Sequence, residues 1–186
     1  MLFLSNGACG DADSTVSNET WAPVNATNLS YIVNGSYSTF AFGVPLVGRA
    51  GPFYRACWAH DPVGLTDYKF EIDAAAELIG PLVRDMECTL GLACSVLLSG
   101  YKLSATNKMA VVSDGACGDA NATVANETWG IANATNVSAN DSMNSSYSFG
   151  TPVVGVAGSF YILCWGYDPV TMSDFNVEVP SELKFG

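Results

Sequence analysis

The sequence is poor in the residue types that most catalytic sites use. It has a single histidine, His60, and only seven lysines and arginines against eighteen acidic residues, which leaves a net charge of −11. Nucleophilic Ser-His and Cys-His systems need a histidine base. His60 is replaced by Tyr167 in a second copy of the same motif. We therefore interpret His60 as a loop or interface residue, and we expect no enzyme activity and no cofactor.

Clustered basic residues and long apolar runs are also missing. Nucleic acids and anionic lipids bind clusters of Lys and Arg, so neither is an expected partner. No apolar run approaches the ~18–20 residues that cross a bilayer, and we expect no membrane insertion. The apolar start Met1–Leu4 is far too short for a signal peptide and aligns with an internal stretch at Met109. We interpret the chain as a processed or trimmed piece of a longer protein.

Repetition is what the chain has in abundance. The motifs A-C-G-D, N-E-T-W, N-A-T-N, F-G-x-P and C-W-x-x-D-P each occur twice, about 107 residues apart. Repeats this regular are typical of a tandem array of one module. The hydrophobic fraction of 49% is ample for a packed core and excludes a disordered chain.

Six cysteines follow the repeat. Cys9 and Cys57 align with Cys117 and Cys164, which leaves two cysteines in the short motif C-T-L-G-L-A-C. The repeat therefore predicts the disulfides Cys9–Cys57, Cys117–Cys164 and Cys88–Cys94. On the chain-entropy model, the two long loops contribute roughly 4 kcal/mol each. The alternative is a metal site, but it would need scattered thiolates, because no C-x2-C occurs and only one histidine is present.

Acceptors for N-glycosylation are far more frequent than chance provides. Ten of the thirteen asparagines begin an Asn-X-Ser/Thr sequon, namely Asn18, Asn25, Asn28, Asn34, Asn121, Asn126, Asn133, Asn136, Asn140 and Asn144. All of them lie in 18–34 or 121–144, between the first and second long-range cysteine of each copy. Sequons mark solvent-facing sites in secreted proteins. We expect a glycan-covered edge on each module and an extracellular or cell-surface location.

Strand patterns dominate the chain, and helical periodicity is almost absent. Only Asp73–Leu78 has good helix formers, and it is too short to stand as a helix without support. The predicted strands are Tyr68–Asp73, Val96–Leu98, Met109–Val112, Thr151–Val154, Phe160–Trp165 and Phe175–Pro180. Many short strands with a disulfide in each module predict an all-β fold of tandem Ig-like antiparallel β-sandwich modules.

A family resemblance supports this fold. The stretch G-P-L-V-R-D-M-E-C-T-L-G-L-A-C-S-V-L-L-S-G-Y-K-L at 80–103 resembles the opening of IPT/TIG-type immunoglobulin-like modules. The combination of C-x5-C, D-G-A-C-G-D and F-Y-x-x-C-W-x-x-D-P is similar to repeats in large secreted surface proteins of dinoflagellates and related protists. The resemblance implies a fold and a compartment and no activity.

The resemblance also sets module boundaries. We expect an Ig-like module without its opening strands at 1–76, a complete module at 77–180, and a linker into a next module or subunit at 181–186. Three explanations stay open for the first module: a window cut from a longer array, which we favour, strands supplied by another chain, or a shortened variant. We expect Leu2, Leu4 and Phe53 to need a partner segment, with contacts between subunits concentrated at 1–5 and 180–186.

Other recurring residues have structural interpretations as well as functional ones. The carboxylates Asp11, Asp13, Asp114 and Asp119 surround the first cysteines and suggest calcium, but no EF-hand spacing is present and we expect no metal. Trp21, Trp58, Trp129 and Trp165 recur in register, as core residues or as a carbohydrate-stacking surface. Asp61-Pro62 and Asp168-Pro169 fit turns.

These observations favour a structural role. The leading hypothesis is a subunit of an N-glycosylated extracellular filament, surface coat or flagellar-hair-like fibre, assembled head to tail, with further copies of itself and covalent N-glycans as its partners. The alternative is an adhesin or receptor ectodomain that binds glycans or a partner protein through an unglycosylated, aromatic-bearing patch.

Overall fold

The protein is all-β in the computed structural model, and its sheets are antiparallel apart from one short parallel pair. The structure describes residues 1–21, 28–31, 38–82, 87–125, 133–141, 143–158, 161–179 and 184–185. The chain divides into two compact units, which we call unit 1 (Met1–Leu78) and unit 2 (Ile79–Gly186). The division falls two residues after the boundary expected at 76.

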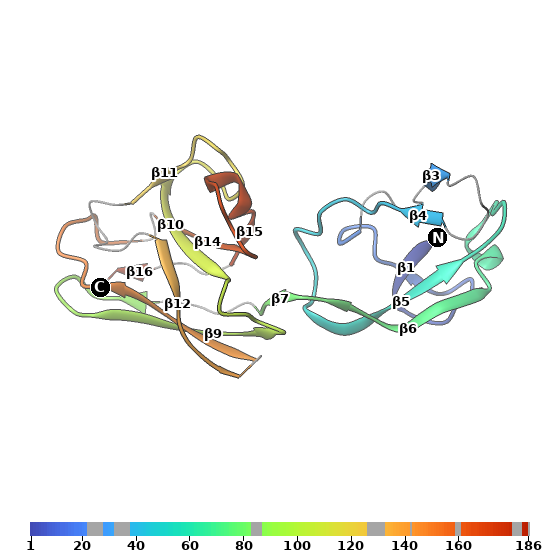
Figure 1. Cartoon of the computed structure of the whole chain (residues 1–186), viewed down its shortest axis with the longest axis horizontal. Helices are drawn as coiled ribbons and strands as arrows, with labels where there is room; N and C mark the ends of the chain where they lie inside the picture. Colours follow the sequence, from blue (N-terminus) through green and yellow to red (C-terminus); the bar gives the residue numbers. More distant parts are fainter. Residues whose placement is uncertain are drawn as a thin grey trace. The chain divides into compact units, whose positions relative to one another are not determined.

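Unit 1 is built on one four-stranded sheet. Its strands are β1 (Leu2–Asn6), β2 (Thr15–Val16), β3 (Asn28–Tyr31), β4 (Ser38–Phe40), β5 (Gly51–Trp58) and β6 (Phe70–Leu78). The sheet has the order β2-β1-β5-β6, and β3 and β4 form a separate two-stranded pair (Figure 1). The long strand β6 therefore lies at an edge of its sheet.

Unit 2 contains the same framework and more strands. The strands are β7 (Gly80–Pro81), β8 (Glu87–Cys88), β9 (Cys94–Tyr101), β10 (Lys108–Asp114), β11 (Thr123–Val124), β12 (Asn133–Asp141), β13 (Asn144–Gly150), β14 (Ile162–Gly166), β15 (Val177–Glu178) and β16 (Lys184–Phe185). Hydrogen bonding runs in the order β15-β14-β10-β12-β13-β9-β7, with β11 also on β10 and with β16 parallel to β8. Strand β12 pairs with β10 through Asn133–Thr135 and with β13 from Asn136 onward.

The two units repeat each other at the level of strand register. In unit 1, Leu2 lies opposite Cys57 across β1 and β5. In unit 2, Ala110 lies opposite Cys164 across β10 and β14. The next strand also repeats, because Glu71 lies opposite Cys57 and Glu178 lies opposite Cys164. The sequence repeat is therefore a repeat of hydrogen-bonded structure.

The turn after the central strand repeats in the same detail. A short 3-10 helix follows each copy of the Asp-Pro motif, η1 at Leu65–Asp67 and η2 at Met172–Asp174. The Asp67 carboxylate accepts the backbone N–H groups of Val63 and Gly64 at 2.8 and 2.9 Å. These N–H groups hold the pKa of Asp67 below its ordinary value. Asp174 forms the same turn, and its pKa is lowered for the same reason.

Glycine is required next to each long-range disulfide. Gly10 and Gly118 follow Cys9 and Cys117 directly, and both have φ of +82°, in the left-handed region that disfavours side chains. A Cβ on Gly10 would also come within 2.9 Å of the Lys69 side chain. The motif A-C-G-D is thus constrained by backbone geometry as well as by the disulfide.

The largest core lies in unit 2, between the two halves of its sheet. Side chains of β9 share one buried cluster with those of β10 and β14, which lie two or more strands away in the hydrogen-bonding order. The cluster comprises Cys88, Cys94, Val96, Leu98, Leu103, Met109, Val111, Ala125, Tyr147, Phe149, Tyr161, Leu163, Trp165 and Val179. A smaller cluster lies around the disulfide on the opposite face of β10.

Two sequence predictions about strands differ from the structure. The strand predicted at Tyr68–Asp73 begins at Phe70 and continues to Leu78 as β6, because pairing with β5 outweighs the helix preference of the alanines in its second half. Thr151–Val154 is irregular, and its Pro152 carries no N–H with which to continue a ladder.

The expectation about the first residues is wrong in one respect. Leu2 and Leu4 are buried, and their strand β1 is paired with β5 on one side and with β2 on the other. They pack with Cys57 and Tyr68 in the cluster around the disulfide. Neither residue needs a partner segment from outside, since the disulfide-bearing loop already covers them. Phe53 remains exposed on its strand, with Arg49 stacked over its ring at 3.7 Å.

Candidate functional site

The three predicted disulfides are present. Cys9–Cys57, Cys88–Cys94 and Cys117–Cys164 have Cα–Cα distances of 5.7, 5.6 and 5.4 Å. In each unit the long-range disulfide lies on one face of the sheet and anchors a small apolar cluster. No cysteine is free.

The predicted glycosylation sites fall into three groups. Asn18 and Asn121 are exposed in turns, and Asn144 is half-buried, with its Oδ1 accepting a hydrogen bond from Ser99 Oγ at 3.1 Å. On strands whose backbone is described lie Asn28, Asn133, Asn136 and Asn140. Outside the described residues lie Asn25, Asn34 and Asn126. The structure thus places two of the acceptors in the open, as N-glycan attachment requires.

The acidic and histidine candidates do not converge. The Oδ1 atoms of Asp11 and Asp119 accept the backbone N–H groups of Asp13 and Asn121, so these carboxylates close turns. Across the part of the chain that the structure describes, no group of three or more His, Cys, Asp or Glu is placed to hold a metal. His60 is highly exposed beside Asp61, where the chain turns with a positive φ.

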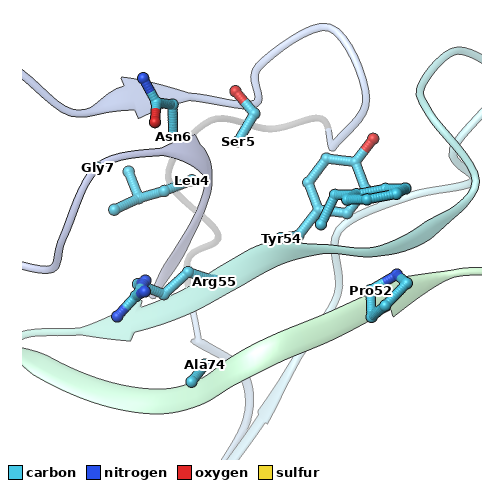
Figure 2. A pocket seen from close by; sticks show the side chains of 9 residues that line it. Leu4, Ser5, Asn6, Gly7, Pro52, Tyr54, Arg55 and Ala74 are labelled. Carbon is cyan, nitrogen blue, oxygen red and sulfur yellow. The ribbon is translucent and has the colours of Figure 1, made fainter.

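A shallow pocket of about 200 Å³ opens where β1 and β5 separate. Its lining runs from Leu4 to Gly7 on one side and from Pro52 to Arg55 on the other, with Ala74 beneath (Figure 2). The Arg55 side chain is paired with Glu71 on the neighbouring strand. The lining carries no nucleophile–base pair, and we assign it no chemistry.

A larger feature is a set of equivalent positions that are buried in unit 2 and more exposed in unit 1. Six residues share one face of the framework in unit 1, and their equivalents in unit 2 are buried in the inter-sheet core. The pairs are Met1 and Met109, Phe3 and Val111, Phe40 and Tyr147, Phe42 and Phe149, Trp58 and Trp165, and Ile72 and Val179. All six unit 1 residues are half-buried or exposed. We call this set the open face of unit 1.

The contrast is greatest at the last pair. Val179 is 1% exposed, whereas Ile72 is 60% exposed. The two residues are chemically alike and occupy the same place after the same Glu, so residue type does not account for the difference. The cause is the covering layer, because in unit 2 the core cluster on this face includes Val96 and Leu98 of β9. No described strand of unit 1 occupies that place.

Aromatic rings gather on the open face. Phe3 stacks on Trp21 at a centroid distance of 4.6 Å and meets Phe42 edge-on at 4.8 Å. Trp58 lies 5.8 Å from Phe70, which is 64% exposed. Contacts of this kind contribute about 0.5–1.5 kcal/mol beyond area burial. The face is therefore ordered by its own rings while its outer surface stays in water.

Burial has electrostatic consequences on the covered face of unit 2. The hydroxyl-bearing ring of Tyr147 lies in the core, and burial raises the pKa of this tyrosine. Its equivalent is Phe40, which carries no titratable group. None of the six residues that define the open face has a charged or titratable side chain.

The open face also ends at an open strand edge. In unit 2, β13 pairs with β12 on one side and with β9 on the other. The equivalent strand β4 pairs with β3, and no other described strand lies beside it. Unpaired backbone edges of this kind template the addition of a further strand.

The sequence predicted a missing layer and named Leu2, Leu4 and Phe53 as the residues that would need it. Leu2 and Leu4 are buried and face the disulfide, and only Phe53 is exposed. On the open face, the exposed apolar side chains are those of Phe70 and Ile72. The signal was available in the strand alternation. Because side chains alternate between faces, Leu2 and Leu4 share the face of the disulfide and Phe3 points to the other.

Comparisons with known proteins do not supply a family. No family model, no curated protein and no solved structure matches this chain. Within the described residues, no helix combines the length and the apolar composition that crossing a membrane requires.

Proposed function

We propose that the protein is a structural subunit of an N-glycosylated extracellular assembly, a filament, surface coat or flagellar-hair-like fibre, built head to tail from Ig-like β-sandwich modules. The observation that carries this proposal is the contrast between equivalent positions, with Val179 buried under a second layer and Ile72 exposed without one. A module whose apolar face is complete only with additional material is suited to assembly.

Three further features support the proposal. The repeated strand register shows that one structural plan is used twice, as in arrays of modules. Disulfides persist in oxidising compartments, which favours an extracellular location. The exposed sequon asparagines Asn18 and Asn121 lie in turns, where glycans leave the apolar faces free to pack.

Electron microscopy of the secreted, glycosylated protein tests the proposal. We expect elongated particles whose axial repeat corresponds to one or two modules, and an average length that grows with protein concentration. Treatment with an N-glycosidase should convert occupied asparagines to aspartate and thin the particles without shortening them. Compact monomers at every concentration, or unmodified asparagine at all ten sequons, would contradict it.

A second candidate function is glycan or protein recognition by an adhesin or receptor ectodomain. One observation favours it, the exposed ring of Phe70 beside the half-buried Trp58, since flat aromatic surfaces stack on sugar rings. Glycan-array binding by the deglycosylated protein distinguishes the two functions. Recognition predicts saturable binding by monomers that Phe70→Ala abolishes, whereas a purely structural role predicts no such binding.

A further inference from the structure

The covered face of unit 2 shows what kind of element fits the open face of unit 1. Strand β9 carries the sequence C-S-V-L-L-S-G-Y, and its alternate residues Cys94, Val96 and Leu98 are buried. None of its eight residues is charged. An uncharged strand with apolar side chains at every second position is therefore the element that this framework accepts.

We propose that the open face of unit 1 is a docking site for a β-strand from another polypeptide that has the alternating apolar pattern of residues 94–101. The inference rests on the proposed function and names the partner that the assembly would use. The docked strand pairs antiparallel with β4 and lays its apolar side chains on Phe42, Trp58 and Ile72.

Backbone register follows from unit 2. There, Val96, Leu97 and Leu98 lie opposite Tyr147, Ser146 and Ser145 of β13. The equivalent residues of β4 are Phe40, Thr39 and Ser38. A strand bound in the same register would thus occupy the side of β4 that β9 occupies on β13, opposite β3. Main-chain bonds supply affinity in such strand addition, and alternate side-chain pockets supply specificity.

The loop after β4 offers a second anchor. In unit 2 the carbonyl of Pro152 accepts the N–H of Gly91 at 2.7 Å, which ties the loop between the cysteines of C-x5-C to the body of the unit. Pro45 occupies the equivalent position in the motif F-G-x-P of unit 1. A donor that includes the C-x5-C loop as well as the strand should therefore bind more tightly than the strand alone.

Other occupants meet only part of this surface. Two copies packed open face against open face would bury apolar rings, but flat packing of the rings supplies no hydrogen bonds to the edge of β4. A glycan would stack on Trp58 and Phe70 and would leave Ile72 in water. A strand satisfies the backbone edge and the apolar side chains together, and for that reason we favour it.

The test uses the full chain with its disulfides and a synthetic peptide of residues 87–107, oxidised between Cys88 and Cys94. Isothermal titration should show one peptide per chain. A peptide with Val96→Asp and Leu98→Asp should bind at least tenfold more weakly. In the protein, Ile72→Asp should weaken binding at least tenfold, and the matched control Val63→Asp, at an exposed position after the Asp61-Pro62 turn, should leave it unchanged.

Hydrogen exchange read by mass spectrometry places the bound peptide. Docking predicts new protection in β4 and in the first residues of β6, with unit 2 unchanged. Protection confined to unit 2, equal affinity of the charged peptide, or self-association through Ile72 that excludes the peptide would each overturn the inference. If fibres form but do not bind the peptide, the docking site is refuted and the proposed function stands. If the protein binds the peptide but never polymerises, the docking site stands and the proposed function is refuted.

Discussion

Units 1 and 2 are the same on one face of their shared framework and different on the other. On the disulfide face, Leu2 and Leu4 in unit 1 are buried like Ala110 and Val112 in unit 2, and each group surrounds a long-range disulfide. On the other face, β9 covers unit 2, whereas no described strand covers the open face of unit 1. The disulfide half of the module is therefore complete in itself, whereas the aromatic half depends on a second layer.

An aspartate at the equivalent positions Val179 and Ile72 should affect the two units very differently. Val179→Asp should lower the free energy of unfolding of unit 2 by about 4 kcal/mol or more, because it buries an unpaired carboxylate in an apolar core. Ile72→Asp, at the equivalent exposed position, should change unit 1 by less than about 0.5 kcal/mol. Hydrogen exchange of β10 and β1 peptides measures each unit separately. Equal losses in the two units would show that Ile72 is covered in solution.

Removal of the long-range disulfides should show where the units agree. The loops closed by Cys9–Cys57 and Cys117–Cys164 span 48 and 47 residues, so replacing either pair by serine should cost roughly 4 kcal/mol on the chain-entropy model. Since no described strand of unit 1 covers its aromatic face, the same loss should unfold it at a lower temperature than unit 2. Calorimetry of the two double variants checks the order. A unit 1 variant that melts later than its unit 2 counterpart would contradict the comparison.

A smaller effect concerns a hydrogen bond that both units share. The hydroxyl of Tyr54 accepts the N–H of Arg49 at 2.9 Å, and that of Tyr161 accepts the N–H of Val156 at 3.3 Å. Tyr54→Phe should cost about 1 kcal/mol, and Tyr161→Phe less, since its bond is longer. Chemical denaturation of the two variants measures both losses. A larger loss at Tyr161 would mean that the loop before β14 is held more firmly than its geometry shows.

The smallest effect lies in the pH dependence of the two capped turns. Backbone hydrogen bonds lower the pKa of Asp67 and Asp174 below the ordinary value of 3.8. Each ionised carboxylate therefore stabilises its unit fully at a pH above 3.8, and this stabilisation is lost as the pH falls through the lowered pKa. Thr171 adds a hydroxyl bond to Asp174 that Gly64 cannot add to Asp67. Carboxyl NMR titration should therefore show that Thr171→Gly raises the pKa of Asp174 and leaves that of Asp67 unchanged.

The elements that sequence reasoning predicted are those that the repeat or strand alternation makes explicit. Alignment of Cys57 with Cys164 was enough to pair the long-range cysteines, and the recurrent Asp-Pro motif predicted a turn at each Asp. The end of β6 could not be predicted, because Asp73–Leu78 has helix-forming alanines and becomes a strand only by pairing with β5. Non-local pairing outweighs local preference there.

The all-β class, the repeated framework and the disulfide pairs could be predicted, since each follows from patterns within or between aligned segments of the chain. The burial of individual apolar residues could not, because it depends on contacts formed in the fold. Ile72 and Val179 each follow the equivalent Glu in sequence, but Ile72 is exposed and Val179 is buried. Leu2 is buried within unit 1, although it was expected to need a partner segment. A side chain is buried by the layer that packs opposite it, and that layer comes from a segment distant in sequence or from another molecule.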